Sequence, residues 1–480
     1  MNTDRRVILL EFNELSPELM DRFIDEGHLP NFKRLRDSSQ AFITEAAERG
    51  WELNPWVQWV TVHSGLDYRD HGIIELDEGP KLKAKRVWDV VSEAGLPVWI
   101  CGSMNIASEK PLNGLVMPDP WSTKVQASDV LQPFFRFVQQ NVLEHSTDRP
   151  SLGKADYARF MTFMMSHGLS FRTVDAIVRQ LMSERADEGV RWKRAVLLDK
   201  LQFDVFRWFY RKLRPAFSTF FSNSTAHFQH YHWREMEPEL FASQASPEKL
   251  AAHEGTILFG YTEMDKLIGR FLELADSDPG TILVFSTAIS QQACTVYEEQ
   301  GGKVMYRPRD IARLMKFANV TETHNAAPLM AEVFNVHLRN EEEAQAVESK
   351  LNRLRIDDRP AMFVQRKENV LTAKCQIHEH IAPDTRISSP SSTESFFDLF
   401  FELEDVKSGM HHPDGIFWVR MPQVAPKRYS EKVTLSSVAP TLLNLLSLPP
   451  ARHMGAPIAA LARQGAPVAV PELVGSASGR

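Results

Sequence analysis

Short apolar runs alternate with amphipathic segments along most of the chain, and this pattern predicts an α/β protein. Helical spacing of apolar residues occurs at 17–26, 29–38 and 87–94. Runs rich in Val, Ile, Phe and Trp predict strands at residues 7–12, 98–101, 217–222 and 282–285. Because helices separate these strands, we expect one mostly parallel central sheet with helices on both faces.

Two stretches interrupt this pattern and predict inserts. Residues 121–213 form a long segment that is predicted to be helical and is rich in Phe, Met and Arg. We expect its apolar side chains to pack in the core. We also expect the segment to cover the site as a cap. Residues 325–390 contain a charged helix, "NEEEAQAVESKLNRLR", and two strand-like runs, "AMFVQRK" and "NVLTAKCQI", and residues 386–395 are expected to form a loop. The core is then formed by residues 1–120, 214–324 and 391–465, followed by a flexible tail at 466–480.

Composition excludes some classes of function. The net charge of −7 argues against a protein that binds nucleic acid through its phosphates. The opening run "VILLEFNEL" is too short and polar for a signal peptide or a membrane span. The three cysteines show no CxxC spacing, so a reduced, cytoplasmic protein is expected.

One strand ends in an unusual set of side chains. In "GTILVFSTAISQQ" the apolar run is followed by Ser286, Thr287 and Ala288, where an α/β enzyme often places Asp, His or Cys. The seven residues "STAISQQ" carry three hydroxyls and two amides, including Gln291 and Gln292. Such groups suit hydrogen bonds to sugar or phosphate oxygens, which predicts a ligand site at this strand end.

Four segments together resemble the alkaline phosphatase superfamily, in its phosphodiesterase and nucleotide-pyrophosphatase branch. They are "VILLEFNELSPELM", "NPWVQWVTVHSGLDYRDHGI", "EMDKLIGRFLELADSDPGTILVFSTAIS" and "HHPDGIFWV" with "SVAPTLLNLLSLPPARHMGAPI". The resemblance covers both ends of the chain and omits the two inserts. It implies a hydroxyl nucleophile at a helix N-terminus, activated by two zinc ions that are held by Asp and His side chains.

Laid on this chain, the family's first-strand Asp falls on Asn13 and the glycine after it on Glu14. The nucleophile falls on Asn54, which is expected to be an N-cap because Pro55 follows it. The Asp and His of the family's Ser-Asp-His-Gly turn fall on Thr287 and Ala288. Neutral Asn and Thr oxygens are poor zinc ligands, so we expect no two-zinc centre.

The other zinc site is better preserved. Its Asp falls on Ala226, but its two histidines fall on His230 and His411, so two imidazoles remain without the carboxylate. We expect one divalent metal ion, zinc, at His230 and His411, or none. A histidine held by hydrogen bonds in the core is the alternative for His230. His378 and His380 in "CQIHEHI" share a predicted strand face but have no third ligand.

These residues leave two classes of function open. The first is a divergent hydrolase or transferase that acts on a small phosphate or sulfate ester, with a sugar or nucleotide as the alcohol part. The second is an inactive relative that binds a phosphorylated ligand or a partner protein in the cleft where the resemblance implies an active site. The candidate catalytic residues are Asn13, Asn54, Ser286 and Thr287, and the candidate ligand-binding residues are Glu14, His227, Gln291 and Gln292.

Overall fold

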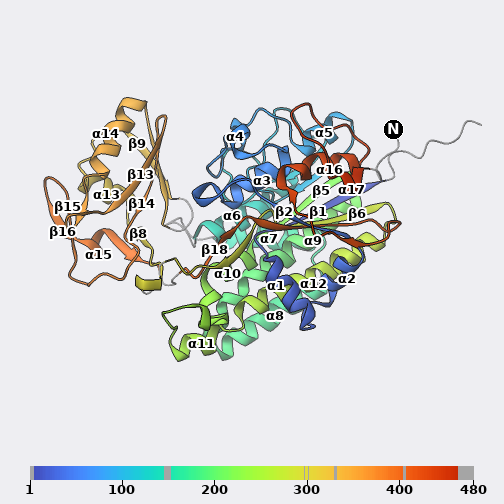
Figure 1. Ribbon diagram of the computed structural model, residues 1–480, viewed down its shortest axis with the longest axis horizontal. Coiled ribbons are helices and arrows are strands. Elements are labelled where there is room, and N and C mark those ends of the chain that lie inside the picture. The colour runs from blue at the N-terminus through green and yellow to red at the C-terminus, as the bar shows by residue number, and fades with distance from the viewer. Residues whose placement is uncertain are drawn as a thin grey trace, which may run out of the picture.

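A large β-sheet forms the centre of the protein (Figure 1). The computed structural model describes residues 5–144, 153–296, 298–300, 302–328, 332–403 and 407–462. The sheet order is β20-β2-β19-β6-β1-β5-β3-β4, and β21 also pairs with β2. The strands are β1 (Arg6–Phe12), β2 (Gln40–Glu45), β3 (Val98–Cys101), β4 (Gly114–Met117), β5 (Phe217–Ser222), β6 (Thr281–Ser286), β19 (Asp414–Arg420), β20 (Lys427–Arg428) and β21 (Val433–Thr434).

The sheet is mostly parallel, as predicted. β1 pairs in parallel with β5 and β6, and β3 pairs in parallel with β4 and β5. β19 runs antiparallel to β2 and β6. All four strands expected from the sequence lie in this sheet. The C-terminal ends of β1, β5 and β6 therefore meet at one edge, where the residues just after each strand come together.

Helices cover both faces of the sheet. Alternate residues of β1 point to opposite faces, and both sets are apolar, so each face has to be buried against helices. Ile8 and Leu10 belong to the hydrophobic cluster of one face, and Val7 and Leu9 to that of the other. The first face is covered by α1 (Pro17–Asp25), α2 (Pro30–Asp37), α9 (Ala195–Leu213), α10 (Ser224–Met236) and α12 (Thr256–Asp276). The second is covered by α3 (Pro55–Ser64), α5 (Val87–Glu93) and α16 (Val438–Leu445). Shorter helices are α4 (Tyr68–His71), α11 (Pro247–His253) and α17 (Ala459–Ala462).

The segment expected to be helical, 121–213, contains α6 (Gln132–Glu144), α7 (Lys154–Ser166), α8 (Phe171–Ala186) and α9. α9 packs against β3, β5 and α12. The expectation that its apolar side chains pack in the core holds only in part. Phe160 and Phe163 are buried, but several large hydrophobic side chains of α7 and α8 are exposed. The expected role of this segment as a cap stays a prediction.

A second lobe lies beside the main sheet, where α13, α14 and the orange strands are drawn in Figure 1. Its own hydrophobic cluster runs from Val304 to Phe400. One sheet has the order β13-β14-β10-β9 and another β12-β11-β15-β16. The elements are β9 (His324–Pro328), β10 (Phe334–Leu338), β11 (Arg355–Ile356), β12 (Arg359–Pro360), β13 (Met362–Lys367), β14 (Val370–Cys375), β15 (Arg386–Ser388), β16 (Thr393–Ser395), α13 (Ile311–Phe317), α14 (Glu341–Leu351) and α15 (Phe396–Leu399).

The sequence predicted the charged helix α14 and the strands β13 and β14 of this lobe correctly. The loop expected at 386–395 is wrong, because β15 and β16 pair there as an antiparallel hairpin. Ile387 is fully buried in the lobe's cluster, and this burial stabilises the hairpin despite its many serines.

Two small strand pairs connect the lobe with the main sheet. β8 (Tyr306–Pro308) pairs with β17 (Phe400–Glu402), and β7 (Ser290–Ala293) pairs with β18 (Gly409–His412). In the second pair His411 lies opposite Gln291. Since β7 follows β6 and β18 precedes β19, this pair lies at the sheet edge where β6 ends.

Candidate metal and substrate site

The first part of the site is the turn after β1. Glu14 is buried and adopts a left-handed backbone conformation with φ of 62°. This conformation costs a non-glycine residue roughly 1–2 kcal/mol, and glycine is the residue expected here from the family resemblance. The Glu14 amide donates to the Thr287 carbonyl at 3.3 Å, and its own carbonyl accepts from Gln229 Nε2 at 2.8 Å. These bonds hold the strained turn in place.

The second part is α10, which begins directly after β5 and carries His230. The Nδ1 of His230 lies 3.5 Å from the carbonyl oxygen of Gly409. Its Nε2 points the other way and lies 3.1 Å from Oε2 of Glu14. Gly409 can approach α10 this closely because it has no side chain, since an added Cβ would lie 2.2 Å from the Gln229 carbonyl oxygen.

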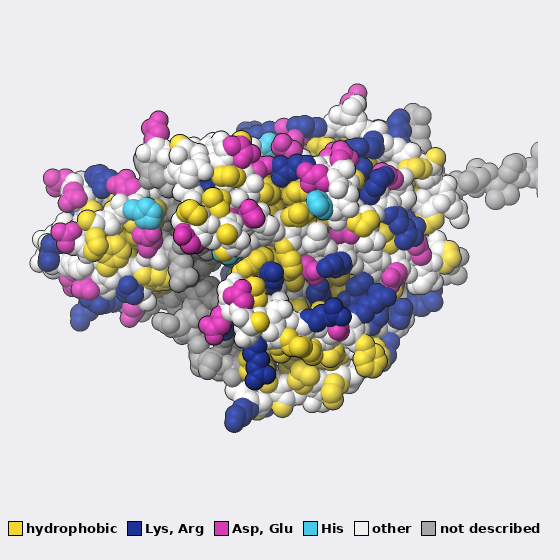
Figure 2. Space-filling view, turned by 90° about the horizontal axis from the view of Figure 1, so that it is seen from below, with side chains coloured by type: hydrophobic (Ala, Val, Ile, Leu, Met, Phe, Trp, Pro, Cys, Tyr) yellow, Lys and Arg dark blue, Asp and Glu magenta, His cyan; other side chains and the backbone are white. Residues whose placement is uncertain are grey.

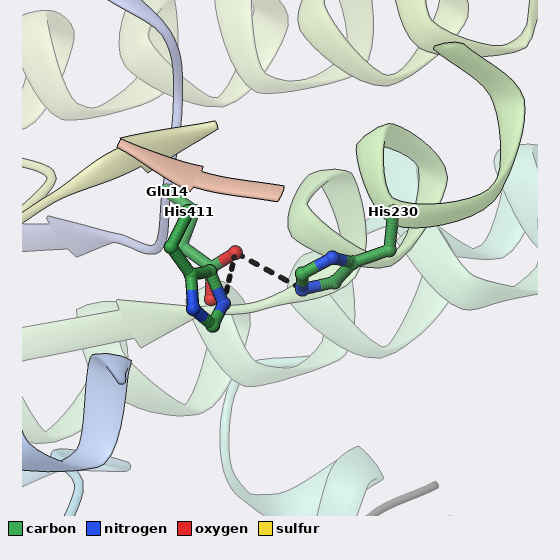
Figure 3. Close-up of side chains that lie close together, drawn as sticks. All are labelled: Glu14, His230 and His411. Carbon is green, nitrogen blue, oxygen red and sulfur yellow. Dashed lines mark ion pairs between the residues drawn. The ribbon is translucent and has the colours of Figure 1, made fainter. Parts of the chain in front are cut away.

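The third part is β18, which brings His411 to the same carboxylate. Nε2 of His411 lies 3.5 Å from Oε2 of Glu14, and the ring also hydrogen-bonds with the backbone of Leu53. Figure 3 shows the two imidazoles approaching the Glu14 carboxylate from different elements. Their donor atoms and the carboxylate lie within 4.8 Å of one another. The side chains of His230 and His411 are 19% and 16% exposed, so the cluster is reachable from solvent.

Two amides fix the orientation of the Glu14 carboxylate. Asn13 Nδ2 donates to Oε1 at 2.8 Å, and Gln291 Nε2 donates to Oε2. Asn13 is itself held by Trp59, whose Nε1 donates to its Oδ1 at 2.8 Å, and by Asn223, whose Oδ1 accepts from its Nδ2 at 2.7 Å. Hydrogen bonds of this kind position a ligand before the metal or substrate arrives.

The electrostatics of the cluster favour a charged carboxylate and neutral imidazoles at neutral pH. Burial by itself would raise the pKa of Glu14, but the neighbouring His411 and His230, together with Lys407, lower it to about 2. Burial lowers the pKa of His411 to about 3, with Glu14 opposing the shift. Burial and Lys407 also lower the pKa of His230. One carboxylate and two imidazole lone pairs are therefore free of protons near pH 7.

This donor set fits a single divalent metal ion. Zinc is bound at about 2.0–2.2 Å by His nitrogens and carboxylate oxygens, so neighbouring ligand atoms lie about 3.0–3.5 Å apart. The two distances from Glu14 Oε2, 3.1 Å to His230 and 3.5 Å to His411, match that spacing. Two histidines and one carboxylate also leave coordination positions open for water and substrate.

The residues at the positions where the resemblance implies the other zinc site offer no carboxylate or imidazole. Asn13 uses its amide in the hydrogen bonds to Trp59 and Glu14. Thr287 Oγ1 accepts from the Ile416 amide at 2.9 Å, which ties β6 to β19. Ala288 offers no ligand atom, and it is fully buried. These three positions serve the structure of the strand ends.

The structure places the other candidate residues as follows. Asn54 is the N-cap residue of α3 and Pro55 its first residue, as expected, but the Asn54 side chain makes no capping hydrogen bond and its Nδ2 donates to the Trp51 carbonyl instead. Ser286 Oγ is buried and accepts from the Ala288 amide at 3.4 Å. His227 is exposed on α10, where its ring contacts Tyr231. Gln292 is exposed on β7, on the side opposite to Gln291. The roles of all these residues stay predictions.

The sequence placed Glu14 among the candidate ligand-binding residues, but it did not predict that its carboxylate lies with His230 and His411. The sequence predicted two imidazoles without one, because Ala226 stands at the family's Asp position. The carboxylate comes from the turn after β1 and not from α10. The sequence signal for it was an acidic residue just after a strand, at the position where the resemblance implies a glycine. Lys407, Trp59, Gln229 and Asn223 were also missed, since none of them stands at a position to which the resemblance gives a role.

Two other candidate groups remain apart from the site. Glu11 and His63 form a fully buried pair, with Oε1 of Glu11 2.8 Å from Nε2 of His63, on the sheet face covered by α3. His378 and His380 follow β14 and do not lie on a strand face, contrary to expectation. Among the described residues, Glu14, His230 and His411 are the group found with metal-ligand spacing.

Neither a family model nor a curated protein matches the chain significantly. Its fold is similar to solved structures over most of its length. Murine ectonucleotide pyrophosphatase/phosphodiesterase 5 has a TM-score of 0.46 and 11% identity, over 94% of this chain and 98% of that chain. Phosphonoacetate hydrolase from Sinorhizobium meliloti 1021 in complex with phosphonoformate has a TM-score of 0.43 and 10% identity, over 91% of this chain and 94% of that chain.

Proposed function

We propose that the protein is a hydrolase of small phosphate or sulfate esters that works with one divalent metal ion. The observation that carries this proposal is the convergence of Glu14, His230 and His411 on one point at the C-terminal edge of the sheet. Ligands in open α/β folds bind at this edge. The four segments that resemble the alkaline phosphatase superfamily support the same reaction class.

The chain's own residues would prepare the site for the ion. Glu14 supplies a negative charge, fixed in direction by the amides of Asn13 and Gln291. His230 and His411 are oriented through Gly409 and Leu53, in the way that metal-binding histidines usually are. A divalent ion bound there would activate water and stabilise negative charge on the ester oxygens.

A cation beside the cluster supports an anionic substrate. Lys407 interacts electrostatically with Glu14 and His411, and burial lowers its pKa. A lysine in this position can contact the oxygens of a phosphate or sulfate group. The N-terminus of α3 is close as well, because Leu53 of its leading turn bonds His411, and the amides of a helix start favour anions.

A second function has one observation in its favour. Asn54 and Pro55 stand where the resemblance implies the hydroxyl nucleophile, and neither can attack phosphorus. If the protein is a hydrolase, water therefore has to attack phosphorus directly while the ester P–O bond breaks. The alternative is a protein that binds a phosphorylated ligand in the same cleft without cleaving it.

Metal analysis combined with substrate assays separates these possibilities. The purified chain is dialysed against zinc or manganese, and its metal content is measured together with hydrolysis of phosphodiesters, phosphomonoesters and sulfate esters. We expect about one equivalent of metal, by the ligand count, and chelator-sensitive hydrolysis of at least one ester class that is lost in His411→Ala. Metal with no hydrolysis but with a thermal shift by inorganic phosphate indicates the binding protein. Two tightly bound zinc ions would overturn the single-metal site.

A further inference from the structure

The exposed hydrophobic side chains of the described residues are concentrated on two helices that follow each other in the chain, α7 and α8. Of the thirteen large hydrophobic residues that are exposed in the described part of the chain, eight lie on α7 and α8. They are Tyr157, Met161, Met165, Phe171, Val174, Val178, Leu181 and Met182. Soluble proteins seldom gather exposed apolar side chains in this way, and such patches mark binding surfaces.

These side chains form a stripe along each helix. On α8 the spacing 171, 174, 178, 181, 182 keeps them on one face, and on α7 the spacing 157, 161, 165 does the same. Phe171 is 94% exposed and Met182 67% exposed, so neither contributes to the core. The opposite side of α8 holds the helix in place, since Ser170 at its N-cap bonds Asp204 and Thr173 is fully buried.

Basic side chains accompany the apolar stripes. Between residues 154 and 194 the chain has eight Lys and Arg against five Asp and Glu, a net charge of +3, whereas the whole chain carries −7. Figure 2 views the molecule from the side where α8 lies in Figure 1, and it shows hydrophobic side chains next to Lys and Arg side chains. The surface is therefore apolar and locally basic on an acidic protein.

A groove joins the two features. It has a volume of about 680 Å³, and its lining includes Val178, Leu181 and Met182 of α8. The lining also includes Arg185, Arg191 and Arg194, with Glu184 and Glu188. Arg194 pairs with Glu184, but within the described residues Arg185 and Arg191 form no ion pair. Arg191 interacts electrostatically with Glu184, but the three arginines of the groove outnumber its two glutamates, which leaves a net positive charge for an anionic group.

We propose that the α7–α8 surface docks the protein on the face of an anionic lipid bilayer. The exposed apolar side chains would enter the boundary between headgroups and acyl chains, and Arg185 and Arg191 would meet lipid phosphates in the groove. Charge argues against a second copy of this chain as the occupant, because a symmetric dimer would bring two basic rims together. None of the described helices has the length and apolarity to cross a bilayer.

Vesicle sedimentation tests this proposal with the full chain. Wild type is mixed with vesicles of phosphatidylcholine alone, or with about 30% phosphatidylserine added. We expect binding to the anionic vesicles, at least about ten-fold weaker binding to neutral ones, and release as salt rises from about 0.1 M to about 0.5 M. Equal binding to both kinds of vesicle, or no binding to either, would overturn the proposal.

Variants locate the contact. Phe171→Ser with Met182→Ser, and separately Arg185→Glu with Arg191→Glu, should each weaken binding at least about ten-fold. The matched controls lie on the second lobe: Phe363→Ser for the apolar pair, and Lys316→Glu with Arg353→Glu for the basic pair, all exposed. These should bind like wild type. A concentration-dependent dimer in sedimentation equilibrium that Phe171→Ser abolishes would show that a second copy covers the surface.

Discussion

Oε2 of Glu14 lies 3.1 Å from Nε2 of His230. Along the chain, all elements from α1 to β5 lie between β1, which precedes Glu14, and α10, which carries His230. This contact replaces the one expected within α10, where Ala226 stands four residues before His230. The carboxylate comes from another element than the resemblance implies, while the two histidines lie at the positions that it implies. Together with His411, the two residues form a group of three side chains with metal-ligand spacing.

Removing the Glu14 charge should abolish metal binding. In Glu14→Gln the side chain keeps its size, but an NH₂ group would face the amide donors of Asn13 or Gln291. Metal content should fall from about one equivalent to below about 0.1, because ligation by two neutral imidazoles alone is weak. Glu45→Gln is the control, since Glu45 lies at the same sheet edge and pairs with Arg49 on the surface. Full occupancy in Glu14→Gln would exclude Glu14 as a ligand.

Restoring the family's Asp at position 13 should destabilise the metal-free protein. Asn13 Nδ2 donates to both Glu14 and Asn223, and a carboxylate there would face two acceptors. We expect Asn13→Asp to lower the free energy of unfolding by about 2–4 kcal/mol, the cost of lost buried bonds and an unpaired charge. Urea unfolding measures this loss, and added zinc should recover part of it. An unchanged stability would mean that Asn13 does not clamp the carboxylate.

Gly409 should tolerate no side chain. A Cβ at this position would lie 2.2 Å from the Gln229 carbonyl oxygen and 2.6 Å from Gln291 Oε1, so β18 would have to move away from α10. Gly409→Ala should cost about 3 kcal/mol or more in the free energy of unfolding, and it should reduce metal content because His411 moves with the strand. Gly455→Ala is the matched control, since its Cβ would have no neighbour within 4 Å. Equal effects of the two substitutions would contradict the packing at β18.

Asp119 should make stability depend on pH. Burial raises the pKa of this carboxyl to about 6, despite hydrogen bonds from Ser122 Oγ and the Trp121 amide. Between the unfolded pKa near 4 and the folded pKa near 6, the folded state holds a proton that the unfolded state has lost, so stability falls as pH rises. The free energy of unfolding of Asp119→Asn minus that of wild type should therefore increase by about 3 kcal/mol as the pH rises from about 4 to about 7.

Calorimetric unfolding of both proteins across this range provides the measurement. The gain is a difference between two proteins at each pH, so the titration of other carboxyls cancels. A constant difference between wild type and variant at all pH values would show that Asp119 ionises normally.

The sequence by itself determined the central sheet, because each strand carries its own signal. Residues 7–12, 98–101 and 282–285 are nearly continuous apolar runs, as expected for strands buried on both faces, and residues 217–222 combine three Phe with Ser and Thr. The resemblance to the alkaline phosphatase superfamily implied that Asn13, Thr287, His230 and His411 lie near one another. In the second lobe the sequence did not predict the β15–β16 hairpin. Its many serines favour a loop, but the burial of Ile387 stabilises the two strands.

Only the tertiary structure decided which side chains form the site and which face the solvent. The position of the Glu14 carboxylate depends on a left-handed backbone turn, which no periodicity reveals, and the position of His411 depends on the register of β18 against β7. The Phe and Met residues of α7 and α8 look the same in sequence whether they are buried or exposed. Spacing fixes which residues share a helix face, but packing against the rest of the chain determines whether that face is covered.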